Sequence, residues 1–166
     1  MTARKANFLG FIACAALLAY AYYAQFVIHL EPCPLCIFQR LGIFAVGVVF
    51  ALAALQDPPG WGRRVYAALI ALAALATVGV AARHLYIQSL PSGSVPACGA
   101  SLDFMLKVFP LTDVLVKVLT GSGECAKVTW RFFGLSMPGW VLIIALGLAA
   151  WGLWANLRRR PPVLRF

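Results

Sequence analysis

Four apolar stretches, each near the length of about 20 residues that an α-helix needs to cross a bilayer, divide this sequence. They cover residues 8–30, 37–55, 65–82 and 138–157, and only the second contains a formal charge, that of Arg40. Charged residues make up 11% of the chain, whereas soluble domains contain about 25%, so lipid is the solvent for most of it. We therefore predict an all-α membrane protein, a four-transmembrane-helix bundle that forms a single membrane domain over residues 1–166.

The first stretch also has some features of a cleaved signal peptide. Arg4 and Lys5 precede it, and Ala19-Tyr20-Ala21 resembles a cleavage site. However, the apolar run continues to Leu30, which is too long for the hydrophobic region of a signal peptide. We expect this stretch to remain as a membrane span.

The basic residues that flank the stretches indicate how the bundle is oriented. Eight of the 14 Lys and Arg residues gather at three places: Arg4 and Lys5; Arg63 and Arg64; and Arg158, Arg159, Arg160 and Arg165. With four spans, these three places and both termini lie on the same side of the membrane. The positive-inside rule assigns that side to the cytoplasm. Residues 31–36 and 83–137 then form two outer loops. The longer loop contains the basic residues Lys107, Lys117, Lys127 and Arg131, which do not oppose this orientation strongly. The same placement at helix ends, rather than in a stripe with interleaved aromatic residues, argues against nucleic-acid binding despite the net charge of +9.

The long outer loop contains one segment with helical periodicity. Its apolar residues recur at helical spacing, at Leu111, Val114, Leu115, Val118 and Leu119. We predict a short amphipathic helix here, either lying flat on the outer leaflet or packing on the protein itself.

Cys33-Pro34-Leu35-Cys36 is a Cys-x-x-Cys motif at the entrance to the second span. If Cys33 caps that helix, Pro34 takes the first helical position, where a missing N–H has no cost. Cys36 then lies in the first turn, where free N–H groups and the helix dipole stabilise a thiolate. The motif therefore favours redox chemistry over a structural role.

Arg40 lies four residues after Cys36, on the same helix face and about one turn deeper. An interfacial arginine often extends towards water as a simple anchor. Its register with Cys36 instead suggests a site for a lipid-soluble electron acceptor that becomes anionic on reduction.

The other cysteines divide into an outer pair and one residue within a span. Cys98 and Cys125 both lie in Gly-rich or Pro-containing loop sequence on the side of Cys33 and Cys36, where an oxidising compartment promotes disulfides. An inert disulfide and a four-cysteine zinc site are the alternatives, and zinc is disfavoured because a second close pair is missing. Cys14 lies mid-span without polar neighbours, and we assign it no role. A lone histidine at the end of a span, such as His29 or His84, is more often a solvated structural residue than a catalyst.

The ordered set of motifs resembles the DsbB family, quinone-reducing membrane enzymes of the bacterial disulfide-forming pathway. The resemblance covers the chain from the first span to about Leu157. Its motifs are Cys33-Pro34-Leu35-Cys36-Ile37-Phe38-Gln39-Arg40, Pro96-Ala97-Cys98, Asp103-Phe104-Met105, Gly123-Glu124-Cys125 and Gly134-Leu135-Ser136-Met137-Pro138-Gly139-Trp140.

This resemblance implies a location in the bacterial inner membrane, with both loops in the periplasm, and a role for each matching residue. A soluble thioredoxin-like oxidase of the DsbA type would attack Cys98, whose partner would be Cys125. Cys33 and Cys36 would reoxidise that pair, with Cys36 facing a quinone, expected to be ubiquinone rather than menaquinone.

The resemblance also implies that Arg40 binds the quinone and that His84 lies near it. Gln39 stands where some relatives have an acidic residue. No metal or flavin is required. The rival hypothesis is a four-span structural or adaptor protein whose loop disulfides are inert, and a thiol reductase that runs electrons in reverse is a third possibility.

Overall fold

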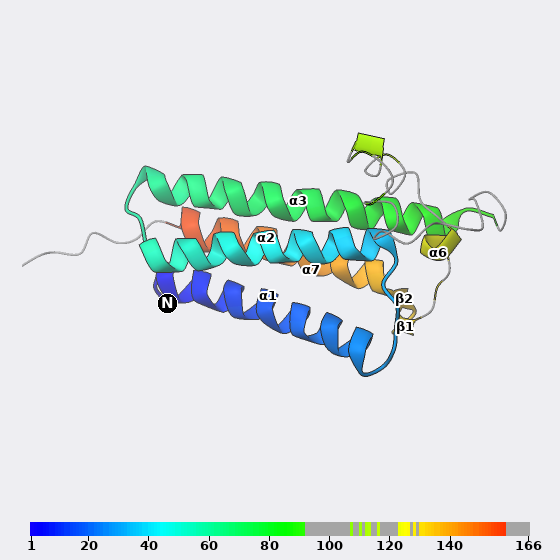
Figure 1. Ribbon diagram of the computed structural model, residues 1–166. Helices are drawn as coiled ribbons and strands as arrows, with labels where there is room; N and C mark the ends of the chain where they lie inside the picture. Colours follow the sequence, from blue (N-terminus) through cyan, green and yellow to red (C-terminus); the bar gives the residue numbers. More distant parts are fainter. Residues whose placement is uncertain are drawn as a thin grey trace, which may run out of the picture.

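Four long helices lie side by side in the computed structural model (Figure 1). They are α1 (Ala3–Phe26), α2 (Pro34–Gln56), α3 (Trp61–Ser89) and α7 (Met137–Leu157). Each is long and apolar enough to cross a membrane, which confirms the predicted all-α bundle of four spans. The structure describes residues 1–91, 123–126, 128 and 130–158, and residues 107, 110, 112, 113 and 116 singly.

Successive helices run in opposite directions, so the links gather at two ends of the bundle (Figure 1). One end holds the start of α1, the link from α2 to α3 and the end of α7. The other end holds the link from α1 to α2, the end of α3, the short helix α6 (Gly123–Ala126) and a hairpin of β1 (Arg131–Phe132) and β2 (Leu135–Ser136). This second end carries Cys33, Cys36 and Cys125.

Two helices differ in length from the apolar stretches that predicted them. α1 ends at Phe26, and the chain then turns back so that the Leu30 N–H donates to the carbonyl of Ala24 over 3.0 Å. α3 has 29 residues and is therefore about 44 Å long, more than the roughly 30 Å of a hydrocarbon core. α3 can thus project beyond the membrane at the end that holds the cysteines.

Small residues allow the helices to approach closely in the half of the bundle that holds the start of α1. A side chain at Gly10 would collide with the ring of Phe50, since the nearest ring atom would be 2.7 Å away. Gly152 accommodates Ile70 in the same way, with a closest approach of 2.4 Å. Close packing of this kind stabilises helix association in lipid, where the hydrophobic effect between helices is absent. Cys14, to which the sequence assigned no role, belongs to this buried core.

The hairpin is fixed to the neighbouring helices at the end that carries the cysteines. Its turn residues Phe133 and Gly134 have φ values of 49° and 78°, as expected for a tight turn between antiparallel strands. Ser136 donates to the side chain of Gln88 on α3 over 2.8 Å, and the Trp140 indole donates to the carbonyl of Phe132 over 3.0 Å. The helix predicted around residues 111–119 lies largely outside the described residues.

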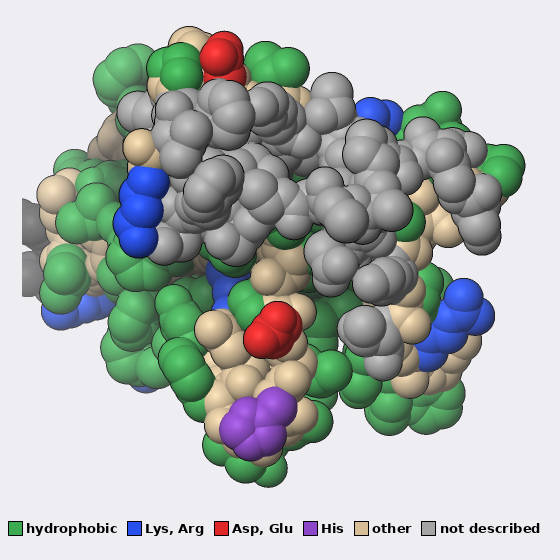
Figure 2. All heavy atoms as spheres, turned by 45° about the vertical axis from the view of Figure 1, so that its right-hand side comes forward, with side chains coloured by type: hydrophobic (Ala, Val, Ile, Leu, Met, Phe, Trp, Pro, Cys, Tyr) green, Lys and Arg blue, Asp and Glu red, His purple; other side chains and the backbone are tan. Residues whose placement is uncertain are grey.

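Figure 2 turns this end of the molecule forward. Hydrophobic side chains cover much of the described surface on its flanks, as expected for a protein that faces lipid. The Lys and Arg side chains on this face stand in separate small groups rather than in one continuous basic patch.

Candidate functional site

The start of α2 places two cysteines at one helix N-terminus. Cys33 is the N-cap, its sulfur accepts from the Cys36 N–H over 3.3 Å, and Pro34 occupies the first turn. These contacts confirm the local geometry predicted from the Cys-x-x-Cys motif. The sulfur atoms of Cys33 and Cys36 lie 2.8 Å apart, and both residues are free thiols. The pair can therefore form a disulfide with little movement of the backbone.

A third cysteine approaches the same sulfur from the outer loop. Cys125, on α6, is 1% exposed and packs with Leu35 and Ile87. Its sulfur, the sulfur of Cys33 and a ring nitrogen of His84 all lie within 4.8 Å of one another. Cys33 thus stands between Cys36 and Cys125, within reach of both. Cys98, the fourth predicted cysteine, lies outside the described residues.

His84, near the end of α3, is buried at 2% exposure, so the expectation of a solvated histidine was wrong for this residue. Its Nε2 lies 3.1 Å from the carbonyl oxygen of Cys125 and 3.7 Å from the sulfur of Cys33. The sequence could not reveal this burial because it depends on where the segment around Cys125 returns to the bundle.

The hydrogen bonds of His84 define which ring nitrogen carries the proton. A carbonyl oxygen only accepts, so Nε2 must donate to Cys125. Nδ1 of the neutral ring then accepts from the side-chain amide of Gln39, 3.0 Å away. Gln39 is 4% exposed and faces this cluster from α2. The signal for this contact in the sequence was the polar amide of Gln39 within an otherwise apolar span.

Electrostatics distinguish Cys33 from an ordinary thiol. Hydrogen bonding to the sulfur of Cys125 and then to that of Cys36, together with burial, raises the pKa of the Cys33 thiol above its usual range. Cys33 lies just before α2, outside the spanning helix. In the reduced protein Cys33 therefore holds its proton, while the N–H groups of the first turn of α2 face Cys36 and favour negative charge there.

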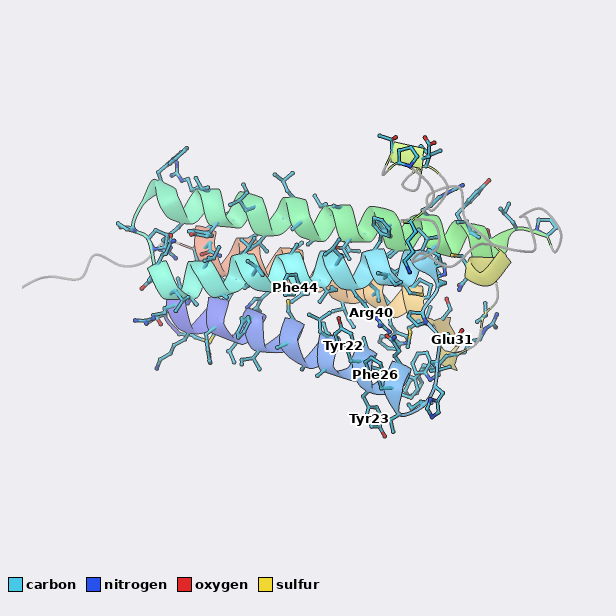
Figure 3. The ribbon with its side chains drawn as sticks, in the orientation of Figure 1. Tyr22, Tyr23, Phe26, Glu31, Arg40 and Phe44 are labelled. Atoms are coloured by element: carbon cyan, nitrogen blue, oxygen red, sulfur yellow. The ribbon has the colours of Figure 1, made fainter. Side chains whose placement is uncertain are left out.

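Arg40 lies between α2 and α1, about one turn deeper than Cys36 (Figure 3). Its guanidinium donates to the side chain of Gln25 and, over 3.0 Å, to the carbonyl of Ala21. It also lies 5.4 Å from the centre of the Tyr22 ring, close enough for a cation–π contact. α1 therefore fixes the position of Arg40, a role of Gln25 and Tyr22 that sequence analysis missed.

A cavity of about 720 Å³ joins these groups. Apolar side chains of α1 and α7 form much of its wall, including Leu17, Leu18, Val141 and Ile144. The polar groups in its lining include Cys33, Cys36, Gln39, Arg40 and His84. A mostly apolar cavity of this size with a few convergent polar groups is typical of a small-molecule site.

This arrangement can exchange disulfides between the half-buried pair Cys33 and Cys36 and the buried Cys125 of the outer loop, beside a cavity that suits an apolar ligand. Arg40 places a positive charge beside the cavity, where it can stabilise an anionic ligand. The N-terminus of α2 supports a thiolate at Cys36. Among the described residues, the site brings together Cys33, Cys36, Cys125, His84 and Arg40.

Comparison with known proteins gives one consistent result. A protein-family model described as "Disulfide bond formation protein DsbB" matches residues 3–155. "Disulfide bond formation protein B" of Nitrosococcus oceani is 51% identical over 154 residues, which cover 93% of this chain and 91% of the relative. The protein of the same name from Marinobacter nauticus is 50% identical over 162 residues, covering 98% and 96%. That of Chromobacterium violaceum is 48% identical over 160 residues, covering 96% of each.

Proposed function

The chain belongs to the DsbB family, and on that premise we propose how its residues carry electrons from a protein dithiol to a membrane quinone. As a member of this family it is a quinone-dependent disulfide oxidoreductase that reoxidises DsbA. Family membership decides against the alternative of a four-span adaptor with inert disulfides.

The first exchange is proposed to occur in the outer loop. A thiolate of the reduced DsbA-type partner attacks Cys98, and the Cys98–Cys125 disulfide opens with Cys125 as the leaving group. The second thiol of the partner then attacks its mixed disulfide with Cys98. The partner leaves oxidised, and Cys98 and Cys125 keep the two electrons and two protons.

The second exchange passes these electrons inwards through Cys33. The sulfur of Cys125 lies within 4.8 Å of that of Cys33, and this observation carries the proposal. Attack of Cys125 on Cys33 would break the Cys33–Cys36 disulfide and release Cys36 as a thiolate. Cys98 then attacks Cys125, which restores the outer disulfide and leaves Cys33 and Cys36 reduced. His84 supports the step because it hydrogen-bonds the main chain of Cys125 beside Cys33.

The cavity beside Cys36 fits a quinone by its chemistry. Its walls are mostly apolar, as a lipid-soluble ring and tail require, and Arg40 offers a fixed cation to a quinone oxygen. Reduced Cys33 and Cys36 would give two electrons and two protons to a bound quinone, which would become a quinol, and the two cysteines would return to their disulfide. Cys36 would face this acceptor as a thiolate, and Arg40, held by Gln25 and Ala21, would stabilise negative charge on it.

The acceptor and the orientation complete the proposal. We assign ubiquinone rather than menaquinone as the acceptor, which a comparison of turnover with short-chain analogues of each will test. The termini are assigned to the cytoplasm and the cysteines to the periplasm, since Arg4, Lys5, Arg63, Arg64 and Arg158 flank the end opposite to the site. A membrane-impermeant maleimide added to spheroplasts should then label reduced Cys98 but no cysteine introduced near the N-terminus.

Partner trapping tests the order of the exchanges. In Cys125→Ser, the lone Cys98 thiolate can attack the disulfide of an oxidised partner and release one of the partner's two thiols. The mixed disulfide between the partner and Cys98 cannot then be resolved by Cys125 and should accumulate as a heavier, reductant-sensitive band on non-reducing gels. Removing Cys98 as well should abolish that band. An equally strong band in the double variant would mean that the partner attacks another cysteine.

A further inference from the structure

The sulfurs of Cys33 and Cys125 and a ring nitrogen of His84 form a compact group of soft ligands. These three atoms lie within 4.8 Å of one another, and the Cys36 sulfur is 2.8 Å from that of Cys33. A tetrahedral zinc ion with Zn–S bonds of about 2.3 Å and a Zn–N bond of about 2.0 Å separates its ligand atoms by roughly 3.5–3.8 Å. Cys33, Cys125 and His84 therefore need only small side-chain adjustments to hold one ion, whereas Cys36, which lies outside this group of three, has to rotate its side chain to reach the ion.

Gln39 adds the outer contact that histidine ligands of metals usually have. Its side-chain amide lies 3.0 Å from Nδ1 of His84. With a metal on Nε2, the proton of the ring moves to Nδ1, and the amide rotates so that its oxygen accepts from Nδ1. A glutamine can serve both tautomers, whereas a histidine nitrogen without such a partner would not be oriented for metal binding.

We propose that the reduced protein binds Zn²⁺ through Cys33, Cys125 and His84, with Cys36 as the fourth ligand. The thiols of Cys33 and Cys125 release their protons to solvent, each sulfur donates an electron pair to the ion, and nothing is oxidised. Disulfide formation removes these thiolates, so only the reduced state binds the metal. Zinc binding depends on this geometry alone, and only the inhibition of electron transfer that follows from it rests on the proposed function.

This site differs from the four-cysteine zinc site considered from the sequence. There, Cys98 was required as a ligand, and a second close pair of cysteines was missing. In the site proposed here, the buried His84 replaces Cys98 as a ligand. The two sites make opposite predictions for the loss of Cys98 and for the loss of His84, which separates them experimentally.

Cobalt substitution tests the proposal directly. The full-length protein in detergent is reduced, freed of reductant and titrated anaerobically with Co²⁺ alone. We expect intense sulfur-to-cobalt absorption in the near ultraviolet and visible d–d bands of a tetrahedral ion, both displaced by stoichiometric Zn²⁺. The oxidised protein is the matched control and should show neither. Absence of these bands from the reduced protein would overturn the proposal.

Variants then identify the ligands. His84→Phe should abolish tetrahedral binding, and Gln39→Leu should weaken Zn²⁺ affinity about 10- to 100-fold, the usual effect of losing an outer-shell partner. Cys14→Ser and Cys98→Ser should retain the cobalt spectrum. An unchanged spectrum in His84→Phe, or its loss in Cys98→Ser, would contradict the assignment.

A second measurement avoids substitutions that disturb folding. In the reduced wild-type protein, Zn²⁺ should slow alkylation of Cys33 and Cys125 at least tenfold, as read by mass spectrometry of their peptides, while Cys98 keeps its rate. Equal protection of all these cysteines would argue for a different ligand set. Quinone consumption with and without Zn²⁺ is measured separately: metal binding without inhibition would leave the site intact and would count against the proposed electron route.

Discussion

His84 and Cys125 are joined across the site by a hydrogen bond from the imidazole Nε2 to the main-chain carbonyl oxygen, over 3.1 Å. The contact links α3 to the loop segment that carries Cys125, and the same nitrogen lies 3.7 Å from the sulfur of Cys33. One side chain thus holds Cys125 of the outer loop beside Cys33, with which we propose that it exchanges a disulfide. The two residues are 41 positions apart in the chain.

Replacing His84 by Phe should slow the exchange between the two cysteine pairs. A buried neutral hydrogen bond contributes about 1–1.5 kcal/mol, so we expect a loss of about tenfold in the rate. Rapid-quench alkylation after mixing with reduced DsbA would measure it. His29→Asn is the matched control, because His29 is exposed and its φ of 58° suits asparagine. Equal rates in the two variants would show that His84 does not position Cys125.

Arg40→Ala should impair the use of quinone while the helices remain folded. The guanidinium is the cation placed beside the cavity, and charged hydrogen bonds contribute about 1.5–3 kcal/mol, so kcat/KM for quinone should fall about 10- to 100-fold. Steady-state kinetics at varied quinone concentration would show this. Gln25→Leu should give a smaller loss, because it removes one of the contacts that hold the guanidinium to α1 without removing the charge.

A control for this experiment is Arg64→Ala, which also removes one positive charge but from an exposed position at the other end of the bundle. It should leave the kinetics unchanged. If Arg40→Ala behaves in the same way as Arg64→Ala, Arg40 is an interfacial anchor and not part of the quinone site.

Alkylation of Cys33 should respond to pH in the direction set by its neighbours. Its pKa is raised, above all by hydrogen bonding to Cys125, so the reactive thiolate should form only above the usual thiol range. Iodoacetamide should therefore modify reduced Cys33 slowly at pH 8–9, roughly the range where an ordinary cysteine titrates. In Cys125→Ala the rate at this pH should rise because the largest cause of the shift has gone. A slower reaction in that variant would show that Cys125 lowers the pKa of Cys33 and does not raise it.

The buried amides of Asn7 and Asn156 should stabilise the bundle at the end opposite to the site. The two side chains donate to each other over 3.0 and 2.9 Å, and Asn156 also donates to the carbonyl of Gly152. Asn7→Ala should lower the free energy of unfolding by about 1–2 kcal/mol, the range for hydrogen bonds between helices in lipid. Denaturation in mixed micelles would measure the loss. The double variant with Asn156→Ala should lose less than the sum of the single losses, and full additivity would rule out coupling.

The sequence predicted those parts of the site that depend on local helix geometry. Cys33 as the cap, Pro34 in the first turn and Arg40 one turn below Cys36 all follow from helical periodicity, and the structure confirms the cap and the first turn. The number of spans was equally predictable, since length and apolarity determine it.

Contacts between distant segments could not be predicted in this way. The burial of His84 depends on the return of the chain at Cys125, and the pairing of Asn7 with Asn156 joins residues 149 positions apart. Gln25 holds Arg40 only because α1 crosses α2 at that level. Polar side chains within apolar spans mark such positions but do not identify their partners.

The final prediction concerns the contact between Cys36 and the quinone. In Cys33→Ala, Cys36 loses the neighbour with which we propose that it forms a disulfide, while the N–H groups at the start of α2 still favour a thiolate. An electron-rich sulfur against an electron-poor quinone ring should then produce a visible charge-transfer band, so the variant with bound quinone should be coloured near neutral pH. Acidification should bleach it, because protonation removes the donor. Adding Cys36→Ser should abolish the colour, whereas Cys14→Ser should preserve it. A band that survives without Cys36 would identify another donor, and the route from Cys33 and Cys36 to the cavity would have to be abandoned.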